Sequence, residues 1–221
     1  MATFNPVAGA NSPCDGEVRE STGSGSTWAS LIGTATGISA SATGTSFAVK
    51  TVSYNVSNQF TDIWRCIMNF DTSSITAGAT ITAATLSLYV NAGYNYGVGL
   101  GDTSVHAVSA TPASTANVVN GDLSQLGSTS FGNFASINAL SGGSYNIMTL
   151  NASGIAAINK TGITSLGLKL GWDIAGSFTG TWGSFLFTGA GFFTADQGTN
   201  FAPVLTVTYS KGNTSSFLAF M

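Results

Sequence analysis

Apolar side chains recur at every second position in several segments of this chain. In segment 63–70, Trp64, Cys66, Met68 and Phe70 share one side of an extended backbone. The same alternation recurs in 85–90 and 205–209. Alternation with β-branched and aromatic residues, bounded by Gly, Asn and Ser, is typical of half-buried antiparallel strands. Further strands are predicted at 14–19, 46–56, 103–109, 143–150, 165–173 and 183–189. Strands separated by turn-rich segments predict an all-β fold, an antiparallel jelly-roll-like β-sandwich.

One short helix is predicted within this sandwich, at 151–160. Asn151 is a good N-capping residue, and Ile155 and Ile158 lie three residues apart, on one face of a helix. The segment 21–45 is predicted to be a long loop with one short strand, and 110–142 a loop-rich excursion. We expect a single domain over 1–210, followed by a separate tail at 211–221.

Composition narrows the functional classes. Ser, Thr, Gly and Ala make up 113 of the 221 residues, and only 7% of residues are charged, although 43% are hydrophobic. Such a chain has enough apolar material for a core, which excludes a disordered protein. Six basic residues cannot neutralise a row of phosphates, so no nucleic-acid partner is expected. No segment resembles a signal peptide or a membrane span, and no membrane partner is expected.

Residues suited to catalysis or metal binding are few. His106 is the single histidine and lies in a strand-like segment, which favours a structural role. Cys14 and Cys66 could pair, but two small buried thiols are the simpler interpretation. Asp15 and Glu17 share one face of a strand and could bind calcium, but a solvated edge is the simpler interpretation. We therefore expect no cofactor, no metal and no enzymatic activity.

Arg65 alternates with the apolar face of its strand. It is expected to pair with Asp62 or Asp71 at the strand ends rather than to bind a ligand.

The central part of the sequence resembles a known family. Residues 65–71 read RCIMNFD and residues 77–89 read AGATITAATLSLY; segments 14–20 and 202–209 look like the first and last strands of the same pattern. This pattern resembles the DNRLRE-type β-sandwich domains. The resemblance implies a jelly roll related to carbohydrate-binding modules, found on bacterial and archaeal surface proteins and in phage structural proteins. Many relatives are modules of secreted chains, whereas this sequence starts with Met1 and shows no export signal, which favours a virion component assembled in the cytoplasm.

Glycan binding is the alternative function. Sugars stack on exposed aromatic rings, and Tyr94 and Tyr96 lie in a glycine-rich loop that cannot easily bury both rings. Trp172 and Trp182 bracket a second loop, and Trp28 lies in the first long loop. Under this interpretation the protein acts in adhesion or receptor recognition outside the cell or at its surface.

The first expectation is a structural protein of a virus particle, such as a bacteriophage capsid decoration or minor capsid protein. Short Ser, Thr, Gly and Ala side chains lose little entropy when a surface is packed against copies of itself or against a larger lattice such as the major capsid protein. The tail carries four large apolar residues that either bind a neighbouring subunit or fold back over the open end of the same barrel. We expect the first, an assembly role, for Phe217, Leu218, Phe220 and Met221.

Overall fold

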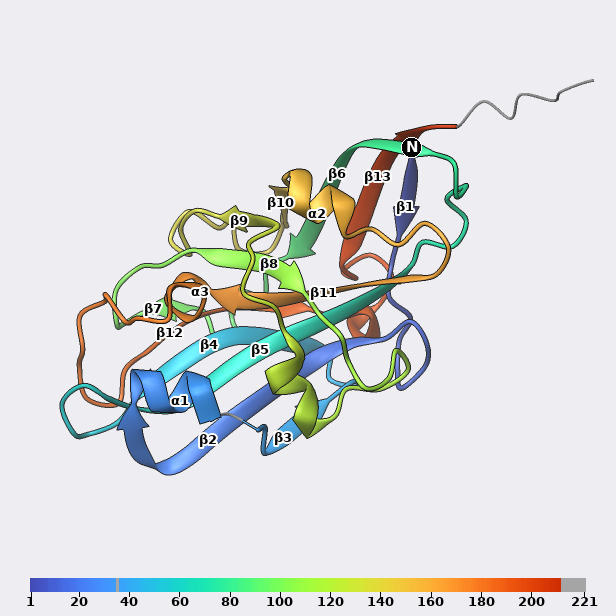
Figure 1. The fold of residues 1–221 in the computed structure, drawn as a ribbon. Helices are drawn as coiled ribbons and strands as arrows, with labels where there is room; N and C mark the ends of the chain where they lie inside the picture. Colours follow the sequence, from blue (N-terminus) through green and yellow to red (C-terminus); the bar gives the residue numbers. More distant parts are fainter. Residues whose placement is uncertain (35, 212–221) are drawn as a thin grey trace, which may run out of the picture.

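A computed structural model describes residues 1–34 and 36–211 (Figure 1). The chain folds mainly into antiparallel strands, which curl into a half-barrel with a few short helices at its margins. The strands are β1 (Ala2–Phe4), β2 (Asp15–Thr27), β3 (Ser39–Ser41), β4 (Ser46–Ser53), β5 (Gln59–Asp71), β6 (Thr80–Tyr89), β7 (Gly97–Val98), β8 (Val105–Ser109), β9 (Gly132–Phe134), β10 (Tyr145–Thr149), β11 (Ile163–Leu170), β12 (Phe187–Phe193) and β13 (Val204–Ser210). The α-helices are α1 (Trp28–Thr34), α2 (Ala152–Ala156) and α3 (Gly171–Ala175), and two 3-10 helices are η1 (Asn120–Gln125) and η2 (Ala195–Gln197).

The strands form two sheets. The smaller sheet has the order β1-β13-β6-β10, and the larger follows β7-β12-β4-β5-β11-β8-β9, with β2 and β3 attached beside β5. This architecture confirms the predicted all-β sandwich.

The long strand β5 is the point from which the larger sheet divides. It pairs with β2 along most of its length, so β2 occupies one edge. Its other edge pairs with β4 over Phe60–Trp64 and then with β11 over Cys66–Asp71. Because β4 and β11 share one edge of β5, the strands beyond them form two diverging branches. The apolar core fills the space between these branches and the smaller sheet.

Aromatic residues bridge the two branches inside the core. Phe47 of β4 packs against Phe192 of β12 with ring centroids 6.0 Å apart, and Phe192 stacks on Phe134 of β9 at 6.4 Å. All three side chains are buried. Large rings in this position keep the β4–β12 and β8–β9 branches apart and exclude water from the space between them.

The predicted strands are all present, but some boundaries differ. The strand predicted at 165–173 is β11, which ends at Leu170 because α3 begins there; the strand predicted at 183–189 begins later, as β12. β5 is not half-buried as predicted: every side chain from Ile63 to Phe70 is buried. The second face of β5 is covered by α1 and neighbouring segments rather than by solvent.

The predicted helix is present as α2. The Asn151 side chain caps it by accepting a hydrogen bond from the Gly154 amide, 3.0 Å away. The prediction for 21–45 is wrong in part, because β2 continues to Thr27 and α1 follows directly, before the short β3.

Within 1–34 and 36–211, no helix is long and apolar enough to cross a bilayer. The predicted tail lies, from residue 212 onward, outside the described residues.

Candidate interaction sites

One end of the sandwich carries a cluster of four aromatic rings. Phe60 of β5 lies 5.2 Å from Trp28 of α1 and 4.7 Å from Phe178, and Trp172 of α3 lies 4.6 Å from Phe178. These contacts are edge-to-face, the geometry that the ring quadrupole favours. Trp28 also lies 6.0 Å from Phe178. Trp28 and Trp172, far apart in sequence, therefore both neighbour the Phe178 ring. Sequence reasoning missed Phe60 and Phe178, although Phe178 lies midway between the two tryptophans that bracket its loop.

A cavity of about 370 Å³ opens beside this cluster. No charged residue lines it; the lining residues are Thr27, Trp28, Ala29, Asn58, Phe60, Gly176, Ser177 and Phe178. The Nε1 atom of Trp28 is buried and has no hydrogen-bond partner within the described chain. The floor of the cavity is thus aromatic and its rim is neutral and polar.

The two tryptophans predicted to bind glycans, Trp172 and Trp182, make most of their contacts within the protein. Trp172 is buried, so little of its ring is accessible to a sugar, and its predicted role in glycan binding stays a prediction. Trp182 is half-buried, and its indole N–H donates a hydrogen bond to the Gln59 carbonyl, 3.2 Å away.

The two loop tyrosines are also held by the protein. The Tyr96 hydroxyl donates to the carbonyl of Ile137 at 2.7 Å, and its ring packs against the core. Tyr94 is half-buried beside Gly191 of β12, where any Cβ would collide with the Tyr94 carbonyl oxygen. Both rings are only partly accessible, and the structure does not bring them to the aromatic end cluster through any contact.

Next to Tyr94, two cations flank a tryptophan on the outer face of β2, β4 and β5. The Lys50 ammonium lies 3.8 Å from the centre of the Trp64 ring, and the Arg19 guanidinium carbon lies 4.9 Å from it. Lys50 also donates to the Asn95 side-chain carbonyl at 2.8 Å. Burial lowers the pKa of Lys50. The hydrogen bond from Lys50 to Asn95 ties β4 to the 91–96 loop.

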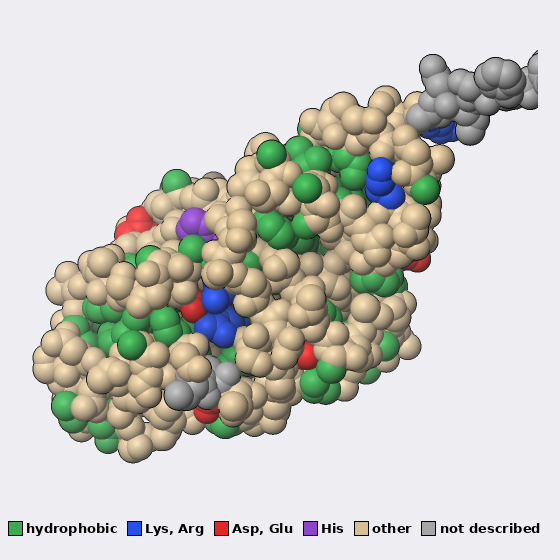
Figure 2. Space-filling view, in the orientation of Figure 1, with side chains coloured by type: hydrophobic (Ala, Val, Ile, Leu, Met, Phe, Trp, Pro, Cys, Tyr) green, Lys and Arg blue, Asp and Glu red, His purple; other side chains and the backbone are tan. Residues whose placement is uncertain are grey.

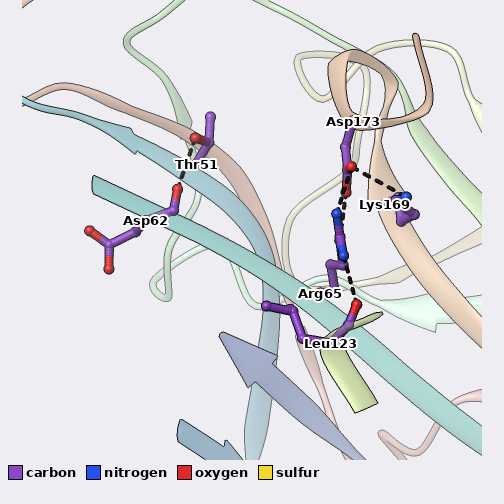
Figure 3. A network of polar contacts seen from close by, with 6 residues as sticks. All are labelled: Thr51, Asp62, Arg65, Leu123, Lys169 and Asp173. Carbon is purple, nitrogen blue, oxygen red and sulfur yellow. Dashed lines mark hydrogen bonds and ion pairs between the residues drawn. The ribbon is translucent and has the colours of Figure 1, made fainter. Parts of the chain in front are cut away.

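Arg65 forms a buried ionic network rather than the predicted pair with Asp62 or Asp71 (Figure 3). Its Nε and Nη2 atoms donate to the two carboxylate oxygens of Asp173 at 2.7 and 2.8 Å, and Nη1 donates to the Leu123 carbonyl at 2.6 Å.

Lys169 approaches the same Asp173 carboxylate at 3.3 Å, and burial lowers the pKa of this lysine. Asp62 uses its main-chain carbonyl to accept from Thr51, and Asp71 accepts from the Ser73 amide. The network ties β5, β11, α3 and η1 together, and both Asp173 carboxylate oxygens are engaged by Arg65 and Lys169.

His106 lies between two hydroxyl groups. Its Nε2 is 2.7 Å from Ser104 Oγ and its Nδ1 is 2.8 Å from Ser130 Oγ. Burial lowers the pKa of the imidazole. Neither contact involves a carboxylate, so the arrangement lacks the acid that would orient a catalytic histidine.

The carboxylates of Asp15 and Glu17 are each bound to a main-chain amide. Asp15 accepts from Ala195 at 3.1 Å, and Glu17 accepts from Ala48 at 3.0 Å. Burial, opposed by the Ala195 hydrogen bond and increased by nearby Asp196, raises the pKa of Asp15 from 3.8 to about 7. Asp15 is 1% exposed, so the expected solvated edge is wrong for this residue. Over 1–34 and 36–211, no three His, Cys, Asp or Glu side chains gather into a possible metal site.

Cys14 and Cys66 are both buried free thiols, so the predicted alternative of a disulfide is wrong. Burial raises the pKa of Cys14 to about 11, and it also raises that of Cys66. Neutral, enclosed thiols of this kind behave as small apolar side chains.

The exterior carries little charge, and Figure 2 shows isolated red and blue atoms on a surface of mostly uncharged groups. Part of the small charge complement is internal: the buried charged residues are Asp15, Arg65, Asp122, Lys169 and Asp173. The smaller sheet is the extreme case, because β1, β6, β10 and β13 contain no charged residue.

The outer face of this smaller sheet carries a row of threonines. Thr3 pairs with Thr206, Thr206 with Thr85, and Thr85 with Thr149, so the row crosses all four strands in register. Adjacent strands lie about 4.8 Å apart, which makes the row about 14 Å long. Beside it, Ile147 of the edge strand β10 is 66% exposed. No charged side chain of these four strands lies on this face, and at the β6–β10 edge it also carries Tyr89 and Tyr145, whose rings lie 5.2 Å apart.

Comparison with known proteins identifies no family for this chain. No family model matches the sequence, and no curated protein matches it at a significant level. The resemblance of segments 65–71 and 77–89 to DNRLRE-type domains therefore stays a prediction.

Proposed function

We propose that this protein is a non-enzymatic structural component of a virus particle, most simply a bacteriophage capsid decoration or minor capsid protein. Its partners are copies of itself and a larger protein lattice. The observation that carries the proposal is the smaller sheet, whose four strands contain no charged residue.

The edges of that sheet support the proposal. Within the described chain, β1 pairs only with β13 and β10 only with β6, so each leaves one edge unpaired. Natural proteins protect such edges with charged side chains, prolines or bulges, because an open edge can pair with another chain. β1 and β10 contain neither a charge nor a proline. A neighbouring protein that covers this sheet removes the need for such protection.

The surface chemistry points the same way. Burying Ser, Thr, Gly and Ala against another protein orders few side-chain rotamers and strips few charges of water. Because the charged side chains of Arg65, Lys169 and Asp173 are buried inside the fold, still fewer charges on the surface would have to be desolvated. His106 and the dispersed carboxylates form no catalytic arrangement that would favour an enzyme instead.

Co-sedimentation with particles tests this proposal. The native source is fractionated on a density gradient, and an antibody against the purified protein is used to probe both the fractions that contain virus-like particles and those that do not. We expect the protein to band with the particles and to stay with them in high salt, because the contact surface is uncharged. A protein found only in the particle-free fractions would refute the proposal.

A further inference from the structure

The end of the molecule that carries the aromatic cavity also exposes apolar side chains. The β4–β5 hairpin presents Val56, 46% exposed, and the turn before β12 presents Phe185 and Leu186, 65% and 41% exposed. Phe185 lies 6.1 Å from Tyr54 in an edge-to-face contact. Together with the cavity, these residues form a surface that we call the tip. Figure 2 shows hydrophobic atoms gathered at this end, where α1 and the loop after α3 lie in Figure 1.

Phe185 is held at the tip in a strained conformation. Its φ of 55° lies in the left-handed region, which is unfavourable for a bulky residue. The turn is fastened to Ser53, whose Oγ accepts from the Leu186 amide at 2.9 Å and whose own amide donates to the Leu186 carbonyl at 2.8 Å. A strained backbone that holds a phenyl ring in solvent does not stabilise the monomer, and such strain is concentrated at sites of function.

The chain leaves the sandwich at the opposite end. β13 finishes at Ser210, which pairs with Thr80 at the start of β6, shortly after β5 has ended at Asp71. The tip lies where β5 begins, at Gln59, and Figure 1 shows the two places at the two ends of the molecule. A strand of the 13 residues of β5 is about 43 Å long.

The segment 212–221 is too short to return to the tip of its own copy. Ten residues span at most about 36 Å when fully extended, which is less than the length of β5. The apolar residues Phe217, Leu218, Phe220 and Met221 therefore cannot fill their own cavity, whereas the cavity of a second copy is open to them.

We propose that copies of this chain associate head to tail, with segment 217–221 of one copy bound at the tip of the next. This inference rests on the proposed structural function and names the partner of the tail.

The chemistry of the two surfaces is complementary. No side chain of segment 217–221 is charged, and neither the cavity lining nor the loops 54–59 and 174–187 carry a charged side chain. An aromatic floor formed by Trp28, Phe60 and Phe178 suits Phe side chains, which can stack on or meet these rings edge to face. A contact between two different surfaces of one protein is heterologous, and it forms rings or filaments according to the rotation between copies.

Sedimentation velocity of the full chain over a concentration series tests the proposal. We expect concentration-dependent association, abolished in two variants: deletion of 212–221, and Ser177→Lys, which places a charge on the exposed cavity rim. Ser128→Lys changes an equally exposed serine away from the tip and serves as the matched control, with wild-type association expected.

Mixing the two defective variants gives the decisive result. The deletion variant keeps an intact tip and Ser177→Lys keeps an intact tail, so we expect the mixture to form a one-to-one heterodimer and nothing larger. Phe185→Gly is an additional variant, because glycine tolerates the left-handed φ. It should raise the thermal midpoint or leave it unchanged while it weakens association, which separates loss of contact from loss of fold.

Several outcomes would overturn the proposal. A wild-type chain that stays monomeric at all concentrations would do so, as would a deletion variant that associates normally or a mixture that stays monomeric. Quenching of tryptophan fluorescence by a neutral oligosaccharide in a monomeric wild type, lost in Ser177→Lys, would assign the cavity to a glycan instead. Each of these results is independent of whether the protein bands with particles, so the structural function can survive them.

Discussion

Replacing Asp15 by Asn should change the pH dependence of stability. The folded protein raises the pKa of Asp15 from 3.8 to about 7, mainly through burial. The folded state therefore keeps its proton up to about pH 7, whereas the unfolded state has lost it above about pH 4. Stability consequently falls as the pH rises between these values. The difference of about three pH units corresponds to about 4 kcal/mol at 1.36 kcal/mol per unit.

Asn retains the oxygen that accepts from the Ala195 amide, 3.1 Å from the Asp15 carboxylate, but it cannot ionise. The variant should therefore be more stable than the wild type above pH 7, by up to about 4 kcal/mol, and this advantage should shrink to about 1 kcal/mol at pH 4.5. It also removes the repulsion between Asp15 and Asp196. Urea unfolding followed by tryptophan fluorescence at half-unit steps between pH 4.5 and 8.5 measures the effect.

Two other groups titrate in or near this window, so the quantity compared is the difference between variant and wild type. Burial raises the pKa of Glu17 in the same direction, and burial lowers that of His106, which makes stability rise with pH through about 6.5. Both contributions cancel in the difference. Asp71→Asn is the control: hydrogen bonds from Ser73 lower the pKa of Asp71, so this carboxylate stays ionised throughout the window and its replacement should leave the slope unchanged. Parallel stability curves for Asp15→Asn and the wild type would refute the reasoning.

Three further predictions concern the buried polar groups. Asp173→Leu leaves the buried cations Arg65 and Lys169 without their carboxylate and should lower the free energy of unfolding, measured in urea, by about 3–5 kcal/mol. This loss should exceed that caused by Arg65→Met, and equal losses would contradict the network. The imidazole of His106 should titrate below pH 6.5 in an NMR titration, because burial lowers its pKa, and a midpoint above that value would show a charged partner. Cys14 and Cys66 should resist a thiol reagent in the folded protein and react fully in denaturant; rapid reaction without denaturant would show that the thiols are accessible.

The strands were predictable because alternation is a local property of the sequence. Each segment with apolar residues at every second position became a strand, and the Asn151 cap placed α2 correctly. The burial of both faces of β5 was not predictable in the same way. It arises because segments distant in sequence pack against the strand: α1 contacts β5, and Arg65 reaches Asp173 of α3 and the Leu123 carbonyl of η1.

The missed helix α1 had a weak signal. Trp28 and Leu31 are three residues apart and both are buried, and this spacing suits a helix. Surrounding Ser, Thr and Gly residues obscured the pattern. The partner of Arg65 carried no local signal, because Asp173 is 108 residues away and reaches Arg65 only through the fold of α3.

The candidate sites were predictable only in part. The sequence indicated Trp28, Trp172 and Trp182 as separate loop aromatics, and the structure joins the first two through Phe178. Side-chain accessibility decided the remaining assignments, and accessibility depends on neighbours that are distant in sequence.

Electron cryomicroscopy of particles purified from the native source is the most direct test of the proposed structural function. We expect this β-sandwich at regularly repeated positions, with the uncharged sheet of β1, β6, β10 and β13 covered by a neighbouring protein. Particles that lack the sandwich, or that display it with this sheet open to solvent, would contradict the proposal.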